Sequence, residues 1–508
     1  MAKQRKMKPR WAQENSGILP AETYKGLTPL DLNHIFDGVE FPTAPLWHQA
    51  VSLAWAGDER KRVHYWHDIG TGKTLTALYT AMLWGCTNIF VVCPSNVVYT
   101  WADEVRKHLR GDHFIVTLQG TTEHRRSSYN FALGHMDRDY NPKIFVINYE
   151  GLRYFFGARK QAGSNLLEYD NTPQFDKEGI DCLIVDEIHR ASNPDSIQTR
   201  VLFDLSRQVP NVIGMSGSPI RKDERDLWAQ YFVIDNGRSL GGNFKRFLAL
   251  NYEQKGFKQV PKPGRLRAVL EAIEPLTLRF SKDECLDLPD VVRQRIIVPR
   301  ATWQDRMSEE LEKQFLESGN NNPAILGIKL AKICGGIIVE EGSHEGEWYT
   351  VSSRGHNPKL NYLLDLLEDI PGKVIVFHHF VLEGRGIEQA LHDNDIGCVS
   401  MRGETKNKME CLRMFLEDPK VKVLVAHPAC ASEGINVQGV CSTVVFYSSD
   451  HSSVARKQAE GRVIRQGQKE KCCIFDLVIA NSIDEVILSA VDNKQDFAEA
   501  VMQWMERR

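Results

Sequence analysis

The 508-residue sequence has no long hydrophobic run and no excess of basic residues. No stretch approaches the roughly 18 consecutive apolar residues that indicate a membrane-spanning helix, so none is expected. Lysine and arginine number 63 against 66 acidic residues, which excludes a uniformly basic chain and leaves any nucleic-acid-binding surface local. The 11 cysteines include no C-x-x-C pair, which argues against a disulfide framework and against a cysteine-rich zinc site.

A secretory signal is also missing, because no apolar core follows the basic start MAKQRKMKPR. These absences predict a cytoplasmic protein (in the host cytoplasm, if the source is viral) with no membrane partner. The basic start is either a solvated tail or an arm that contacts phosphates. Length and a hydrophobic content of 42% predict about three globular domains with a sizeable core.

The most informative stretch is HDIGTGKTLTALYTAM, from His67 to Met82. The apolar and aromatic run before it predicts a strand, and apolar residues at helical spacing after it predict a helix. Strand, glycine-rich turn and helix form the context of a phosphate-binding loop. Gly70 and Gly72 let consecutive N–H groups face one anion, and the helix N-terminus adds its partial positive charge.

Two residues of this loop have side chains suited to a nucleotide. Lys73 can reach the β- and γ-phosphates, and the Thr74 hydroxyl can bind Mg²⁺. The general pattern has a glycine five positions before Gly72, where this sequence has His67. The alternative interpretation is an ordinary glycine-rich turn with an exposed lysine.

An acidic pair follows a second strand-like run, in DCLIVDEIHR. Ligands of open α/β sheets bind at the carboxyl ends of strands, which is where Asp186 and Glu187 are expected. Asp186 would hold Mg²⁺, and Glu187 would orient and deprotonate the attacking water. A solvated acidic pair is the alternative. The later turn at 216–219, SGSP, either senses the γ-phosphate or is simply a turn.

Three further features have two interpretations each. Gln49 is either a reader of the adenine edge or a surface residue. The basic stretch 255–267 is either a contact to a nucleic-acid backbone or an exposed loop. In SVARKQAEGRVIRQGQ, Gln458, Arg462 and Arg465 recur at helical spacing, which predicts one helix face. That face is ordinary if solvated, but an arginine supplied to a γ-phosphate would stabilise transition-state charge.

Strand-like and helical patterns alternate in two separate blocks, and the second block has no phosphate loop. This alternation predicts an α/β fold with two lobes and a helical segment between them. The expected domains are a basic N-terminal tail (1–30), lobe one with the ATP site (31–235), a helical interlobe segment (236–356), lobe two (357–482) and a C-terminal helix (483–508).

In its ordered motifs the chain resembles helicase superfamily two, and within it the Swi/Snf-like DNA-dependent ATPases. The motifs that carry this resemblance are Gln49, HDIGTGKT, VVCPSNVVYTW, INYEGL, VDEIHR, MSGSPI, ASEGIN and QAEGRVIRQGQ. GRVIRQGQ, DLW at 226–228 and LRFSKDECLDLP at 278–289 are more specific to the Swi/Snf group. The sequence departs from that group at Phe280, where a second arginine is usual, at CASEGIN and at HSS (451–453). It also lacks the long lobe-two insertion of chromatin remodellers. These departures suggest a compact bacterial or phage-type relative.

The resemblance implies two RecA-like parallel-sheet lobes around one site for ATP and Mg²⁺, with nucleic acid across both lobes. It assigns the nucleotide and Mg²⁺ to Gln49, Gly70, Thr71, Gly72, Lys73, Thr74 and Asp186, and hydrolysis to Lys73, Asp186 and Glu187. From lobe two, Gly434, Gln458, Arg462 and Arg465 are expected to complete the site. Contacts to the tracked strand are assigned to Pro94, Ser95, Asn96, Asn148, Tyr149, Arg402, Gly403, Ala431 and Ser432.

The expected function is ATP-driven translocation on DNA (duplex, fork or junction) by a monomer. One alternative is an RNA or single-strand DNA helicase, because the DEIH tetrad does not separate these classes. Another is a nucleic-acid-binding scaffold without turnover, against which the intact Lys73, Glu187 and Arg465 argue. Beyond the ATPase motifs, no cluster of carboxylates suggests a nuclease.

Overall fold

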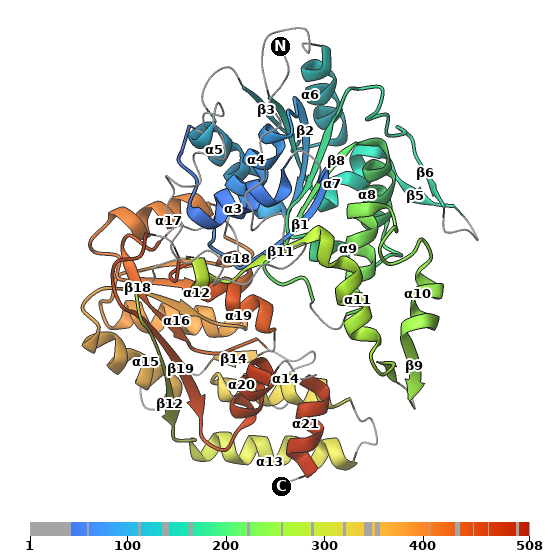
Figure 1. Ribbon diagram of the computed structural model, residues 1–508. Helices are drawn as coiled ribbons and strands as arrows, with labels where there is room; N and C mark the ends of the chain where they lie inside the picture. The colour runs from blue at the N-terminus through green and yellow to red at the C-terminus, as the bar shows by residue number, and fades with distance from the viewer. Residues whose placement is uncertain are drawn as a thin grey trace. The chain divides into compact units, whose positions relative to one another are not determined.

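The structure, a computed structural model, divides into two compact units between Leu286 and Asp287 (Figure 1). Unit 1 precedes this point and unit 2 follows it. Residues 42–506 are described, with the exception of 58–59, 110–112, 135–141, 162–165, 221–223, 256–257, 286–288, 318–321, 340–347, 351–355, 406, 432–436, 451, 466 and 494–496.

Unit 1 is built on a seven-stranded sheet with the order β11-β1-β8-β7-β2-β4-β3, in which all neighbours pair in parallel. Its strands are β1 (Arg62–His67), β2 (Asn88–Cys93), β3 (Phe114–Thr117), β4 (Lys143–Asn148), β7 (Cys182–Val185), β8 (Asn211–Met215) and β11 (Thr277–Phe280). Parallel strands that are buried on both faces consist of nearly continuous apolar residues, as in NIFVVC of β2.

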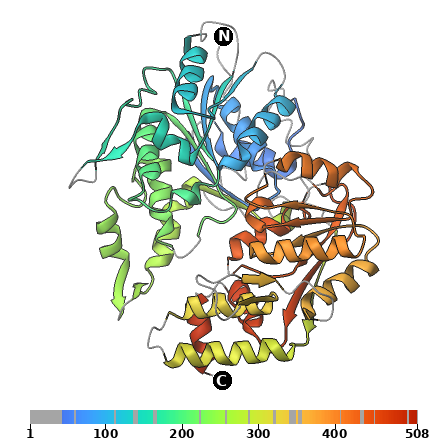
Figure 2. The ribbon, with the colours of Figure 1, turned by 180° about the vertical axis from the view of Figure 1, so that it is seen from behind.

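Helices cover both faces of this sheet (Figures 1 and 2). Along β2, Ile89 and Val91 belong to one hydrophobic core and Phe90 and Val92 to another, because successive strand side chains point to opposite faces. The first core includes residues of α3 (Trp47–Ala56), α4 (Lys73–Leu83) and α5 (Val98–His108). The second includes residues of α6 (Thr122–Gly134), α7 (Tyr149–Phe156), α8 (Ile197–Gln208), α9 (Asp226–Asp235), α10 (Phe244–Asn251) and α11 (Arg265–Ile273).

Short elements complete unit 1. They are the 3-10 helices η3 (Ser95–Val97), η4 (Ile188–Ala191) and η5 (Glu274–Leu276), the helix α12 (Lys282–Cys285) and two small antiparallel sheets. These sheets pair β5 (Arg159–Lys160) with β6 (Leu167–Glu168) and β9 (Tyr252–Lys255) with β10 (Lys258–Pro261).

Unit 2 has a six-stranded parallel sheet with the order β12-β19-β18-β15-β17-β16. Its strands are β12 (Val291–Val298), β15 (Lys373–Phe377), β16 (Cys398–Met401), β17 (Val423–Ala426), β18 (Cys441–Phe446) and β19 (Cys472–Ile479). Side chains of β15 again alternate between two cores, with Val374 and Val376 in one and Ile375 and Phe377 in the other.

The helices of unit 2 are α13 (Thr302–Glu317), α14 (Pro323–Cys334), α15 (Pro358–Asp369), α16 (Val381–Asp393), α17 (Lys408–Glu417), α18 (Pro428–Ala431), α19 (Ser453–Glu460), α20 (Ile483–Asn493) and α21 (Phe497–Glu506). A hairpin joins β13 (Ile337–Val339) to β14 (Trp348–Thr350). The two parallel sheets with their helices confirm the expected α/β fold with two parallel-sheet lobes.

Segment 236–356, expected to be a helical connection, is divided between the two units and also contains strands. It supplies β11 to the edge of the first sheet and β12 to the edge of the second. Leu278 and Phe280 alternate with the exposed Arg279, so β11 buries one side of its chain in unit 1. The expected single C-terminal helix is the pair α20 and α21. No helix in the described ranges is long and apolar enough to cross a membrane.

A buried ion pair joins two helices of unit 2 and provides a test of its stability. Nζ of Lys359 lies 2.7 Å from Oδ2 of Asp484 and donates to the carbonyl oxygen of Tyr447 at 2.9 Å. Asp484→Asn would leave the ammonium buried without a counter-charge. We expect a loss of about 3–5 kcal/mol in the free energy of unfolding, measured by urea denaturation. Glu410→Gln, which breaks an exposed pair with Arg413, should barely move the midpoint; equal shifts in both variants would contradict this expectation.

Candidate functional site

The glycine-rich loop connects the carboxyl end of β1 to the N-terminus of α4. Gly70 and Gly72 have φ values of 89° and 79°, in the left-handed region that favours glycine. A Cβ at Gly72 would lie 2.4 Å from Nε2 of Gln49, so a side chain there would collide with α3. This backbone, followed at once by a helix N-terminus, has the form of an anion-binding loop.

Lys73 lies in the first turn of α4 and is only 9% exposed. Its Nζ donates to the carbonyl oxygens of His67 at 3.1 Å and Asp68 at 3.3 Å. The turn that follows β8 lies beside it, since a Cβ at Gly217 would be 3.3 Å from Nζ and 2.9 Å from Cγ1 of Ile69. The turn at 216–219 is therefore packed against the phosphate loop. Thr74 is next to Lys73 in the same helical turn.

Gln49 is 3% exposed, and its amide holds the backbone of the loop. Nε2 donates to the carbonyl oxygens of Gly72 at 3.2 Å and Thr71 at 3.4 Å, and Oε1 accepts from the N–H of Leu46 at 2.8 Å. Burial lowers the pKa of His48 to about 4, so the neutral ring can donate from Nε2 to the same Thr71 oxygen at 2.8 Å. Two consecutive residues of α3 thus hold the backbone of the loop in place by hydrogen bonds.

His67, a departure from the general phosphate-loop pattern, is in contact with Phe280, a departure from the Swi/Snf pattern. His67 ends β1 and faces Phe280 of β11 in the parallel register, with ring centroids 5.3 Å apart. Both residues are fully buried, and Nε2 of His67 lies 3.0 Å from Oγ of Ser52. A charged arginine at position 280 would be buried beside this histidine, and burial of its charge would cost free energy. The apolar ring of Phe280 carries no such cost.

The acidic pair follows β7 at the same edge of the sheet as the loop. The N–H of Asp186 donates to the carbonyl oxygen of Val92 at 2.8 Å, and its Oδ2 accepts from Nε1 of Trp101 at 2.9 Å. Burial and then the neighbouring Glu187 raise the pKa of Asp186 to about 6. A divalent cation would offset both effects, so this carboxylate fits a Mg²⁺ site with a hydroxyl such as that of Thr74. Glu187 has a φ of 48°, an uncommon conformation for a residue other than glycine.

The family resemblance assigns Tyr149 to contact with the tracked nucleic-acid strand. In the structure this side chain supports the acidic pair from inside unit 1. It is 3% exposed, and its hydroxyl shares its proton between the carbonyl oxygens of Asp186 at 2.8 Å and Glu187 at 3.2 Å. The adjacent Asn148 is buried as well, and its Nδ2 donates to Oε2 of Glu150 at 3.0 Å. These side chains therefore lie in the interior and not on an open surface.

His189 connects the acidic pair to the turn after β8. Its Nδ1 lies 2.8 Å from Oγ of Ser216 and 3.2 Å from Oε2 of Glu187. Oγ of Ser216 also accepts from the N–H of Ser218 at 3.1 Å. Sequence reasoning gave no role to His189 or Trp101. The last position of the DEIH tetrad could have indicated His189, whereas no local signal indicates Trp101.

The remaining expected contact in unit 1 begins where β2 ends. Pro94 is buried and precedes the 3-10 helix η3, which leads into α5. Ser95, the first residue of η3, is exposed. Asn96 belongs to the same helix, but its side chain lies outside the described residues. This segment is at the carboxyl edge of the sheet, as are the phosphate loop and the acidic pair.

In unit 2, Arg402 follows β16 and is paired with Glu388, with NH2 2.6 Å from Oε2. Gly403 is next to it, with open space where a Cβ would be. Ala431 ends α18, while Ser432 and Gly434 lie outside the described residues.

The prediction of one helix face with Gln458, Arg462 and Arg465 is wrong. Helix α19 contains Gln458 but ends at Glu460, and the two arginines lie in the turns that follow. Gly461 caps the helix, since glycine is a poor helix former. The sequence analysis also missed Arg456, which anchors α19 by donating to both carboxylate oxygens of Asp476, at 2.5 Å and 2.9 Å.

Comparison with known proteins agrees with the motifs. Residues 48–321 match the SNF2-related domain, and residues 358–467 match the helicase conserved C-terminal domain. Protein p41 of Acyrthosiphon pisum secondary endosymbiont phage 1 is 22% identical, over 88% of this chain and 96% of that protein. A SWI/SNF-related matrix-associated actin-dependent regulator of chromatin subfamily A-like protein 1 homolog of Caenorhabditis elegans is 24% identical, over 92% of this chain.

The chain thus spans nearly all of the phage protein but only 63% of the Caenorhabditis elegans protein. Among solved structures, the Sulfolobus solfataricus SWI2/SNF2 ATPase core in complex with dsDNA aligns with 89% of this chain and 92% of that chain, at 19% identity. Its TM-score of 0.38 is too low for the two chains to be compared as whole molecules.

The geometry of the acidic pair generates a test of its chemistry. Glu187→Gln keeps the size of the side chain but removes the carboxylate that accepts a proton from water. We expect ATP turnover to fall by about a hundredfold or more, with nucleotide affinity retained, measured by phosphate release and by equilibrium binding. Asp195→Asn, at an exposed carboxylate paired with Arg200, is the control and should behave as the parent. Near-normal turnover in Glu187→Gln would refute the assignment.

Proposed function

The chain belongs to the SNF2-related family of ATPases, and on this premise we propose that it is a motor that couples ATP hydrolysis to movement along DNA. The observation that carries the proposal is the convergence of three motifs at one sheet edge. The loop at Lys73, the acidic pair and the turn at Ser216 are joined by contacts at that edge. The same edge contains the segments of unit 1 that the family resemblance assigns to DNA.

In the proposed reaction, the N–H groups of Gly70–Thr74 and the Lys73 ammonium bind the phosphates of ATP. Thr74 and Asp186 would hold Mg²⁺, which when bound neutralises part of the phosphate charge. Glu187 would accept the proton of the attacking water. His189 restrains Glu187 against Ser216, so a change at the phosphate could reach the acidic pair through two side-chain contacts.

Unit 2 would supply positively charged side chains to the γ-phosphate. We assign Arg465, with Arg462, to the transition-state charge on the γ-phosphate, and Gly434 and Gln458 to nucleotide binding. A planar guanidinium suits this role because it can bind two phosphate oxygens at once. These assignments rest on the family pattern in GRVIRQGQ, in which both arginines are present.

DNA contact is proposed for segments that follow strand ends in both units. In unit 1 these are Pro94–Asn96 and the backbone at Asn148–Tyr149; in unit 2 they are Arg402–Gly403 and Ala431–Ser432. Contacts to phosphates would position the motor without reading base sequence, as movement along DNA requires. The preferred form of DNA, whether duplex, fork or junction, belongs to this proposal.

Two side chains could transmit DNA binding to the acidic pair through their hydrogen bonds. Ser95 begins η3, which leads directly into α5, and α5 contains Trp101, which donates to the Asp186 carboxylate. Tyr149 begins α7 and donates to the carbonyl oxygens of the pair. A strand that contacts the first turns of α5 and α7 would therefore hold Asp186 and Glu187 in one position. We propose that DNA stimulates turnover by this route.

A pair of conservative variants tests this coupling. Tyr149→Phe and Trp101→Phe each remove one donor while keeping an aromatic ring. We expect the DNA-stimulated ATPase rate to fall about tenfold, with smaller effects on the basal rate and on the KM for ATP. Tyr154→Phe, at an exposed tyrosine of the same helix α7, is the control. A loss of basal and stimulated rates in equal proportion would indicate a merely structural role.

The proposed motor function can be tested on nucleic-acid substrates. We expect ATPase stimulation by duplex DNA, displacement of a third strand from triplex DNA and weak separation of a plain tailed duplex. Binding should weaken steeply as salt rises, because each neutralised phosphate releases counterions. Efficient unwinding of the tailed duplex, or stimulation by RNA but not by duplex DNA, would replace this proposal with a conventional helicase. Absence of any ATPase activity would favour a scaffold.

A further inference from the structure

A concave surface of unit 1 lies at the amino ends of the strands, whereas the phosphate loop lies at their carboxyl ends. It consists of two cavities of about 630 Å³ and 680 Å³, which share Ser239 and Ala272 as lining residues. We call this surface the basic groove. The basic residues that line it are Arg60, Lys61, Arg62, Arg238, Arg246 and Arg265.

The position of the basic groove separates it from the nucleotide site. Arg62 begins β1, Pro210 directly precedes β8, and Leu276 directly precedes β11, so the groove lies at the amino ends of three adjacent strands. The phosphate loop follows the carboxyl end of β1. Because β1 has six residues, the two sites are on the order of 16 Å apart. An occupant of the groove would therefore leave the loop accessible.

The positive charge of the groove is not neutralised by its own lining. Asp235 is the one carboxylate among the lining residues, and both its oxygens accept hydrogen bonds from the chain that follows it. These donors are the N–H groups of Gly237, Arg238 and Ser239 and the hydroxyl of Ser239. Within the described ranges, no carboxylate forms an ion pair with Arg238 or Arg246. Burial and then the charge of Arg238 lower the pKa of Arg62, whereas the charge of Asp235 raises it, so the two guanidinium groups lie close together beside one carboxylate.

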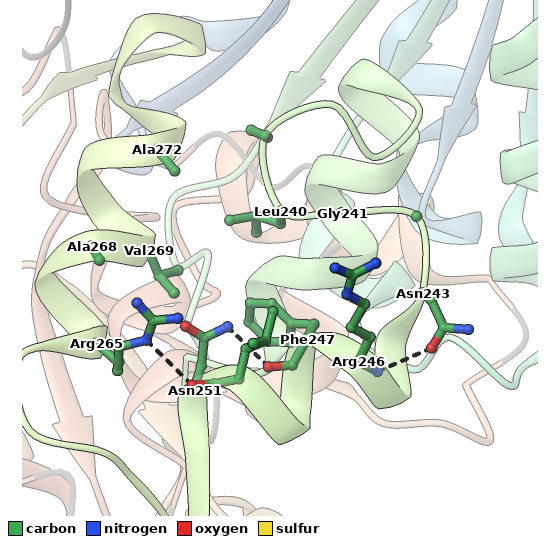
Figure 3. A pocket seen from close by; sticks show the side chains of 13 residues that line it. Leu240, Gly241, Asn243, Arg246, Phe247, Asn251, Arg265, Ala268, Val269 and Ala272 are labelled. Carbon is green, nitrogen blue, oxygen red and sulfur yellow. Dashed lines mark hydrogen bonds between the residues drawn. The ribbon is translucent and has the colours of Figure 1, made fainter.

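The floor of the groove is apolar. Helices α10 and α11 flank the cavity in Figure 3, and Leu240, Phe247 and Val269 point into the space between them. Phe247 is 3% exposed, whereas Leu250 at the margin is 49% exposed. Nε of Arg265 donates to the carbonyl oxygen of Leu250 at 3.2 Å, which holds this arginine at the rim above the apolar floor.

We propose that the basic groove binds an acidic peptide segment of a partner protein. One or two apolar side chains of the segment would enter the cavity between α10 and α11, and its carboxylates would pair with the arginines at the rim. The apolar floor favours a peptide over nucleic acid, because a phosphate backbone paired with the arginines would bring no apolar side chain into the cavity. The inference does not depend on the proposed motor function.

The test begins with selection of peptides on the full-length protein. A phage-displayed random peptide library is panned against the parent chain, and the enriched peptides are synthesised with a fluorescent label. We expect them to be acidic and to contain large apolar residues. Their affinity is then measured by fluorescence anisotropy against Arg246→Glu, Arg238→Glu and Ala272→Trp, which reverse the charge at either cavity or fill their junction.

The matched control is Lys245→Glu, an equal charge reversal at the exposed neighbour of Arg246, which does not line the groove. We expect affinity to fall about tenfold or more in the three groove variants and less than about twofold in Lys245→Glu. Basal ATPase activity and the melting temperature should match the parent in all four, which shows that the variants are folded.

Three results would overturn the proposal. One is the enrichment of no peptide, or only of neutral or basic peptides. Another is equal affinity of the enriched peptides for the parent and for Arg246→Glu. The third is that a labelled duplex oligonucleotide, and no peptide, loses affinity in the groove variants but not in Lys245→Glu, which would assign the groove to nucleic acid.

Discussion

Parallel pairing of the strands in unit 1 is the constraint on which the candidate site depends. Because β1, β8, β7, β2 and β4 all run in one direction, their carboxyl ends meet at one edge of the sheet. The residues that follow these ends are the phosphate loop, the turn at Ser216, the acidic pair, Pro94–Ser95 and Tyr149. An antiparallel strand in this set would carry its loop to the opposite edge. The sheet therefore assembles motifs that lie far apart in the sequence.

Side chains behind the site then determine its geometry. Gln49 and His48 hold the loop through the carbonyl oxygens of Thr71 and Gly72, which fixes its backbone relative to α3. Trp101 and Tyr149 hold the acidic pair by its carboxylate and its backbone. Such restraint maintains preorganised donors and acceptors, which stabilise a transition state without reorganisation during the reaction. It also sustains the uncommon backbone conformation of Glu187, which would otherwise relax.

The same sheet separates two kinds of surface. Its carboxyl edge contains the catalytic motifs, and its amino edge contains the basic groove, formed by segments that precede β1, β8 and β11. Sites at opposite ends of the same strands would allow a peptide and a nucleotide to be bound at the same time. The unusual residues His67 and Phe280 lie opposite each other on the neighbouring strands β1 and β11, with their rings in contact.

The sequence by itself determined the features that depend on local chemistry. The two-lobe α/β fold follows from alternating apolar and helical patterns, and the phosphate loop follows from Gly70, Gly72 and Lys73, since the required backbone needs glycine at fixed positions. The acidic pair was predicted because it ends a buried strand.

Tertiary structure alone decided which distant residues support these motifs. Trp101 lies 85 residues before the carboxylate to which it donates, and Tyr149 lies 37 residues before it. No periodicity or spacing encodes such contacts, because they arise when separate strands pair side by side. The same reason explains the ion pair between Glu460, the last residue of α19, and Arg293 of the distant β12. It also explains the basic groove, which gathers arginines from positions 60 to 265.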